Sequence, residues 1–132
     1  MDYFDLAINA GSNSLPLDYK TRLSVHIHRA YKTLSYLLPK KLLQKVNVNL
    51  WVFNDERAYS AFQKKHAPGL VGSSAGFHTA KNNIAAALRT HDQQLLHTSV
   101  HEAVHVMNFG MFGNIPRWLN EGLAEYFESM QV

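Results

Sequence analysis

Residues 101–105 of this chain read His-Glu-Ala-Val-His, and the rest of the sequence is best understood from this stretch outward. Apolar residues recur around it with a helical period, which predicts a helix that stops near Gly110. Because residues four positions apart share one face of a helix, His101 and His105 direct two imidazole nitrogens toward one point. Glu102 leans to the same side. Two imidazoles at this spacing suit a zinc ion, which typically takes four ligands and here has places left for a protein side chain and a water molecule.

The helix that follows supplies a candidate third ligand. Pro116 is tolerated in the first turn of a helix, and residues 117–127 continue with an apolar stripe. The short link between the two helices favours an antiparallel hairpin. His105 lies about 6 Å of helical rise before the first helix ends, and Glu121 lies about 6–8 Å after the second begins. The two residues are therefore expected at the same level, and Glu121 is the predicted third ligand.

Glu125 is predicted to form a hydrogen bond with a metal ligand without contacting the metal itself. It lies one turn after Glu121, which is backwards along the first helix, so it is expected level with His101. A carboxylate there would accept the second ring N–H of His101 and fix its tautomer. His97 is rejected as a ligand, because histidines on three successive turns begin about 12 Å apart along the axis and do not converge on one tetrahedral ion.

These residues carry a resemblance to a known family. The pattern His-Glu-x-x-His at 101–105, followed by Asn120-Glu121-Gly122, resembles the gluzincin, or peptidase MA-like, zinc metallopeptidases and their compact minigluzincin forms. The resemblance covers the last quarter of the chain and implies that Glu121 is the third zinc ligand, with an acidic residue four positions later outside the ligand set. Two features depart from the larger members: the gap of fifteen residues between His105 and Glu121 is shorter, and the sequence ends right after the glutamate helix, where larger members carry a second subdomain.

The activity that follows is metal-assisted hydrolysis of a peptide or protein substrate. Zinc held by His101, His105 and Glu121 would lower the pKa of its water molecule toward about 7. Glu102, which is not a ligand, would take the proton as general base and pass it to the leaving amine. Two other hypotheses stay open. One is a catalytically inactive zinc domain that serves recognition or needs a missing C-terminal subdomain, and the other is a structural domain whose histidines are incidental.

Composition and charge describe one folded domain. The chain has 132 residues, 46% hydrophobic and 17% charged, which suits a globular protein with a single core. Its net charge of +3 comes with no basic stripe interleaved with aromatic residues, so no nucleic-acid partner is expected. The absence of cysteine excludes a disulfide framework and a thiolate zinc site. No stretch reaches membrane-spanning length. Residues 1–132 are expected to form one domain, with 1–16 as a lead-in, and are compatible with a fragment of a longer protein.

Two further helices are predicted before the motif. Residues 17–38 have apolar side chains at helical spacing and are closed by Pro39, so a long helix is expected to back the sheet. A shorter helix is expected to start after a cap at Asp55 and to end near His66. The histidines outside the motif that receive no metal role are His26, His28, His66 and His91.

About three strands complete the expected α+β, zincin-like fold with its backing helix and helical hairpin. Residues 46–53 alternate and are β-branched, which predicts a strand with its even-numbered residues on one face. Residues 76–80 and 84–88 favour a hairpin, although the triple alanine within them equally suits a helix. In the resembling enzymes a strand beside the motif helix pairs with the peptide substrate. His78 lies where it could face such a groove, although a structural or surface role is favoured.

Overall fold

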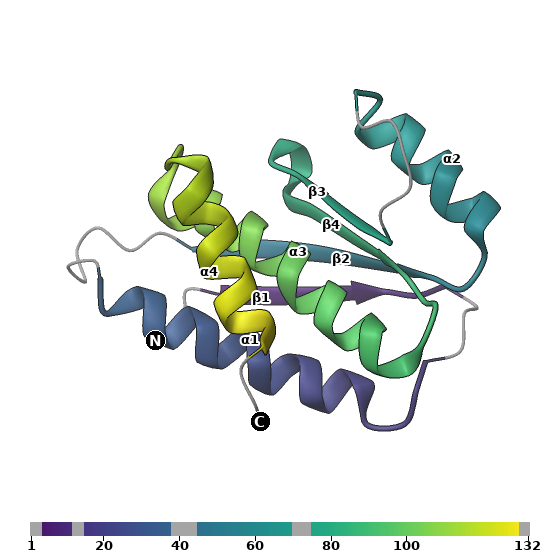
Figure 1. Ribbon diagram of the computed structural model, residues 1–132, viewed down its shortest axis with the longest axis horizontal. Coiled ribbons are helices and arrows are strands. Elements are labelled where there is room, and N and C mark those ends of the chain that lie inside the picture. The colour runs from purple at the N-terminus through teal and green to yellow at the C-terminus, as the bar shows by residue number, and fades with distance from the viewer. Residues whose placement is uncertain (1–3, 12–14, 38–44, 70–74, 130–132) are drawn as a thin grey trace.

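The computed structural model describes residues 4–11, 15–37, 45–69 and 75–129, and within them the chain is an α+β domain (Figure 1). Four α-helices pack around a four-stranded mixed sheet with the strand order β1-β2-β4-β3. The elements are β1 (Phe4–Asn9), α1 (Tyr19–Ser35), β2 (Val46–Phe53), α2 (Glu56–His66), β3 (Gly76–Thr79), β4 (Ile84–Leu88), α3 (Asp92–Phe112) and α4 (Arg117–Ser129), with a short 3-10 turn at Lys81–Asn83.

The first strand corrects the expectation of a lead-in over residues 1–16. Phe4–Asn9 runs parallel to β2, with Phe4 opposite Val46 and Asn9 opposite Trp51. Leu6 and Ile8 of this strand pack against the core, and two core positions are too short a pattern to be recognised locally. The backbone hydrogen bonds that it forms with β2 make it a strand. Among the described residues the sheet therefore has four strands, where about three were expected.

The hairpin expected over residues 76–88 is confirmed. Strand β3 pairs antiparallel with β4, and β4 also lies parallel to β2 in the sheet. All three alanines of β4 are fully buried because helices cover the strand on both faces. Ala85 and Ala87 belong to the main core, and Ala86 belongs to a smaller core on the opposite face. Small side chains in this strand therefore let the helices on both faces approach the sheet closely.

The main core fills the space between the sheet and three helices. In Figure 1, α1 and α3 lie on one side of the sheet, and α4 lies across α3. The even-numbered residues of β2 face this core, as predicted, and α2 covers the opposite face through Tyr59. Asp55 caps α2 by accepting a hydrogen bond from the Arg57 backbone, as expected of that position. No helix in the described part of the chain is long and apolar enough to cross a membrane.

The end of α3 differs from the prediction. The helix continues past Gly110 to Phe112, and Gly113 with its positive φ of 70° follows it. A Cβ atom at Gly110 would lie 2.9 Å from Val46 Cγ1, so this glycine allows α3 to pack closely on β2. After a short link, α4 begins at Arg117, directly after Pro116, and folds back over α3 (Figure 1).

Candidate metal centre

The structure brings the three predicted metal ligands together. His101 and His105 lie one turn apart on α3, and their Nε2 atoms are 3.2 Å from each other. Glu121 reaches them from α4, with its Oε1 atom 2.6 Å from His105 Nε2 and 3.4 Å from His101 Nε2. The two Nε2 atoms and the carboxylate Oε1 therefore lie close enough together to be ligands of one metal ion.

These three atoms fit the donor set of a zinc ion. In a tetrahedral site with bonds of about 2.0–2.1 Å, neighbouring ligand atoms are about 3.3–3.4 Å apart, and two of the three observed separations are close to this value. The third, from Glu121 to His105, is shorter. Glu121 Oε1 is buried and accepts no hydrogen bond from the part of the chain that the structure describes. A buried carboxylate oxygen without a donor is unfavourable, and a cation at this position would compensate it.

The carboxylate that contacts the Nδ1 atom of His101 is that of Glu128. The prediction that Glu125 makes this contact is wrong. His101 Nδ1 lies 3.0 Å from Glu128 Oε1, whereas Glu125 is exposed. Seven residues after Glu121, a helix has returned to within about 20° of its starting direction, compared with about 40° after four residues. Helical side chains also tilt toward the N-terminus of their helix, so the Glu128 side chain leans back toward Glu121.

Asn120 plays the corresponding role for His105. Its Oδ1 atom lies 2.8 Å from His105 Nδ1 and also accepts a hydrogen bond of 2.9 Å from the buried Asn108 side chain. An acceptor at Nδ1 keeps the proton on that nitrogen and leaves the Nε2 lone pair free to bind a metal ion. In the sequence, Asn120 appeared only as the neighbour of Glu121, and its contact with His105 depends on how α4 crosses α3.

Carboxylates around His101 determine its preferred charge. Burial on its own lowers the pKa of the His101 imidazole, but the hydrogen bond to Glu128 and the charges of Glu102, Glu128 and Glu121 outweigh it. The pKa of His101 is therefore raised above the ordinary histidine value. Three carboxylates around one imidazole create a site that favours positive charge, from a proton or from a metal ion.

The pKa of His105 moves the other way. Burial lowers it most, and the nearby His78 lowers it further, while the hydrogen bond to Asn120 and the charges of Glu121 and Glu102 oppose the shift only in part. Because the neutral imidazole is the form that binds a metal ion, its surroundings hold His105 in the metal-binding form.

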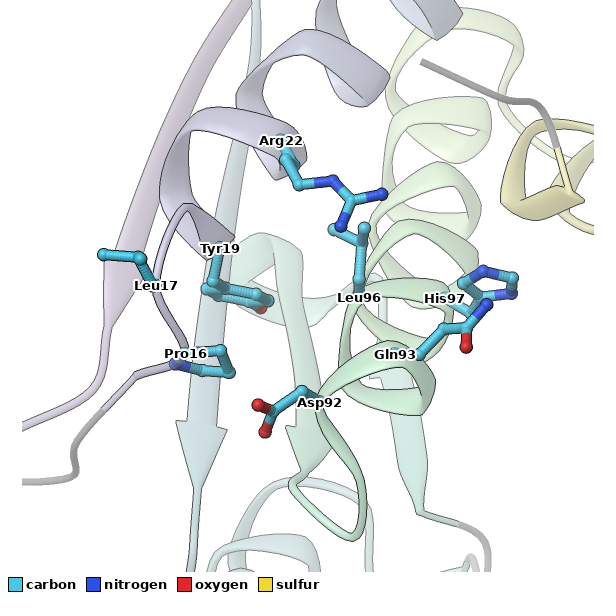
Figure 2. A pocket seen from close by; sticks show the side chains of 8 residues that line it. All are labelled: Pro16, Leu17, Tyr19, Arg22, Asp92, Gln93, Leu96 and His97. Carbon is cyan, nitrogen blue, oxygen red and sulfur yellow. The ribbon is translucent and has the colours of Figure 1, made fainter.

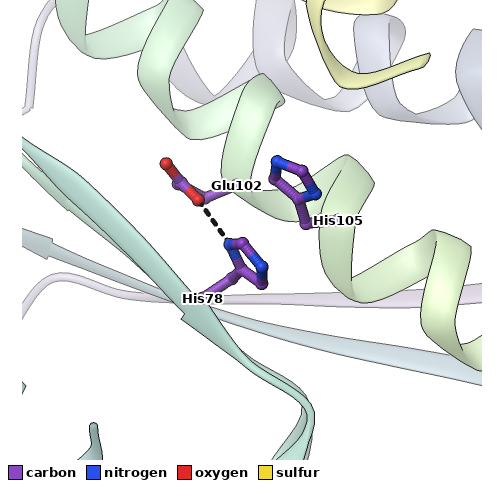
Figure 3. A group of neighbouring side chains, drawn as sticks. All are labelled: His78, Glu102 and His105. Atoms are coloured by element: carbon purple, nitrogen blue, oxygen red, sulfur yellow. Dashed lines mark hydrogen bonds and ion pairs between the residues drawn. The ribbon is translucent and has the colours of Figure 1, made fainter. Parts of the chain in front are cut away.

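His78 meets Glu102 beside this centre (Figure 3). Its Nδ1 atom lies 2.8 Å from Glu102 Oε1, and its ring stacks on the His105 ring with centroids 4.1 Å apart. The sequence favoured a structural or surface role for His78, and its contact with Glu102 depends on the packing of β3 against α3. His78, Glu102 and His105 are themselves close enough to bind a cation. His105, however, has Nδ1 engaged with Asn120 and Nε2 directed at Glu121, so it has no nitrogen left for a second ion.

A separate cavity lies between the first turns of α1 and α3 (Figure 2). It has a volume of about 410 Å³, and Tyr19, Arg22 and Asp92 contribute to its lining. His97, which was excluded as a ligand, also lines this cavity, one turn before His101. The donor atoms of the candidate metal centre lie outside it.

Comparison with known proteins gives one partial match. Residues 95–132 match the family described as "Protein of unknown function (DUF1570)". The matched segment contains His101, Glu102, His105 and Glu121, and it leaves out His78. No curated protein and no solved structure matches the chain.

Proposed function

We propose that this chain is a zinc-dependent peptidase of the gluzincin, or peptidase MA-like, type. The observation that carries the proposal is the convergence of His101, His105 and Glu121 on one position, with separations of 2.6–3.4 Å between their donor atoms. Partners on the outer nitrogens of both histidines support it, because such contacts orient imidazoles as metal ligands.

Each residue then has a defined part in hydrolysis. His101, His105 and Glu121 would hold a zinc ion, which would supply Lewis acidity to make water a stronger nucleophile and to polarise the scissile carbonyl. Glu102 follows His101 on α3 but does not belong to the ligand set, so its carboxylate is available as the general base. It takes a proton from the attacking water and delivers it to the amine nitrogen that leaves.

The sheet supports a peptide as the substrate. Strand β3 stands last in the strand order of the described residues, and it lies beside the motif helix through His78 and Glu102. An extended peptide can add to such an edge by pairing its backbone with the strand. The edge strand, the motif helix and the glutamate helix support the proposal of a zincin-like fold, which the sequence resembles.

Metal analysis combined with cleavage of unfolded casein tests the proposal. We expect about one zinc ion per reconstituted chain. Glu102→Gln should retain the metal and reduce cleavage by a factor of at least about 100, because proton transfer by a positioned base contributes about 10²–10⁴-fold. The exposed Glu125→Gln is the matched control and should leave both quantities unchanged.

The other outcomes select the other hypotheses. A chain that takes up no zinc after reconstitution is a structural domain with incidental histidines. Stoichiometric zinc without cleavage indicates a metal-binding domain that is not a peptidase. Undiminished cleavage by Glu102→Gln means that a contaminating protease acts or that another residue is the base.

A further inference from the structure

Strand β3 packs against the motif helix beside the side chain of Glu102. Gly76 and His78 lie two positions apart on β3, so they face the same side of the sheet. A Cβ atom at Gly76 would overlap Thr98 Cγ2 and lie 3.0 Å from Glu102 Cγ. Glycine at position 76 therefore leaves room for the Glu102 side chain, and His78 binds the carboxylate at the end of that side chain with a separation of 2.8 Å.

Two contacts set the orientation of the His78 ring. Its Nδ1 atom faces Glu102 Oε1, and its plane lies nearly parallel to the His105 ring, at an angle of 14° (Figure 3). The His78 side chain is 40% exposed, whereas that of Glu102 is 12% exposed. Because burial does not immobilise His78, its orientation depends on the carboxylate and on the ring beneath it.

We propose that His78 is the positioning residue for Glu102, an inference that rests on the proposed peptidase function. A glutamate side chain has several rotatable bonds, and a general base acts only when it lies within hydrogen-bond reach of the proton it removes. The Nδ1–H group of His78 donates to Glu102 Oε1 and holds the carboxylate in one orientation. In this proposal the second oxygen, Oε2, is the one that accepts the proton of the attacking water.

His78 keeps its own proton throughout this cycle. Glu102 takes one proton from water and returns one to the leaving amine, so the proton balance closes without His78. His78 is not counted among the ligands, because the group of donor atoms formed by His101, His105 and Glu121 does not include it. Its loss is therefore expected to reduce the turnover number and to leave zinc binding in place.

Two substitutions of His78 separate positioning from a structural role. Asparagine places its side-chain amide nitrogen close to the position of the histidine Nδ1, whereas glutamine places it one bond farther out. With casein as substrate and zinc-loaded protein, we expect His78→Gln to lower kcat by about 10–100-fold, as small misplacements of catalytic groups do, with KM and zinc content nearly unchanged. His78→Asn should recover most of kcat. Equal kcat in the two variants, or a loss of zinc in both, overturns the proposal.

The tautomer of His78 provides a readout that does not depend on cleavage. In long-range ¹H–¹⁵N spectra of the full chain, His78 should carry its proton on Nδ1, and Glu102→Ala should shift the proton toward Nε2. A proton on Nε2 in the unmodified chain overturns the positioning role even when the protein is an active peptidase. If the unmodified chain binds zinc and cleaves nothing, the peptidase function and the catalytic part of this proposal both fall. In that case a proton on Nδ1 still establishes the contact between His78 and Glu102.

Discussion

His26 and His105 are equally buried, each 4% exposed, but their surroundings differ. His105 has Asn120 at Nδ1 and Glu121 at Nε2, whereas His26 Nδ1 has no hydrogen-bond partner in the described residues. Burial lowers the pKa of both rings. The difference teaches that burial does not identify a metal ligand. An acceptor on one nitrogen and a carboxylate facing the other nitrogen distinguish His105, the proposed ligand, from His26.

The largest predicted effect is the loss of zinc binding when His105 is replaced, in contrast to the replacement of His26. His105→Gln should abolish stoichiometric zinc binding, because only His101 and Glu121 would remain of the three ligands. The stabilisation that zinc gives, about 2.7 kcal/mol at a concentration 100-fold above Kd, should disappear with it. Equilibrium dialysis and thermal unfolding with and without zinc measure both quantities.

His26→Gln is the matched control for that experiment. It removes an equally buried imidazole and should leave the zinc content and the zinc-dependent rise in Tm as they are in the unmodified chain. The comparison breaks down if the His26 variant loses its metal while the His105 variant keeps it.

A smaller effect is expected from the carboxylate behind His101. Glu128→Gln should weaken zinc affinity by about 10–100-fold, because partners of this kind orient the ring and raise its basicity. Glu125→Gln, a few residues earlier on the same helix but exposed, should change the affinity little. Competition with a chromophoric chelator measures the affinities. A larger loss in the Glu125 variant would restore the arrangement expected from the sequence.

Helical periodicity explains how much of the site could be predicted. The positions of His101, His105 and Glu121 follow from rise and spacing along two helices joined by a short link, and the structure brings these residues together. The prediction of Glu125 considered only the rise along the helix, whereas the direction of the side chains favours Glu128, which returns to within about 20° of the direction of Glu121. The contact of His78 with Glu102 depends on two segments that are 24 residues apart, so no local pattern indicates it.

The same distinction applies to the fold. The strand at Val46–Phe53 and the hairpin that ends at Leu88 have strong local patterns and were predicted. Strand Phe4–Asn9 has few core contacts of its own and forms by pairing with β2, more than 35 residues later. Gly110 was assigned to a helix end because glycine is common there. Its actual role is to make room for Val46, a contact that only the packed structure shows.

The smallest predicted effect concerns the pH dependence of stability at His26. Burial lowers the pKa of His26 most, and the charges of Arg22, His97 and Arg29 lower it further, against an opposing hydrogen bond with the Phe127 backbone. The unfolded chain therefore binds a proton at His26 at a higher pH than the folded chain does. This difference destabilises the folded state as pH falls below the ordinary value of 6.5, with a slope of at most about 1.4 kcal/mol per pH unit.

His26→Gln removes the proton-binding group and should remove this contribution. Denaturant unfolding of both proteins with a chelator present, from pH 8 to pH 5, gives the difference in free energy of unfolding without a contribution from bound metal. We expect the unmodified chain to lose stability relative to the variant as the pH falls through 6.5, and the difference to stay constant above that value. A difference that is constant over the whole range would mean that the folded protein protonates His26 as readily as the unfolded chain, and that the unpartnered Nδ1 is open to water.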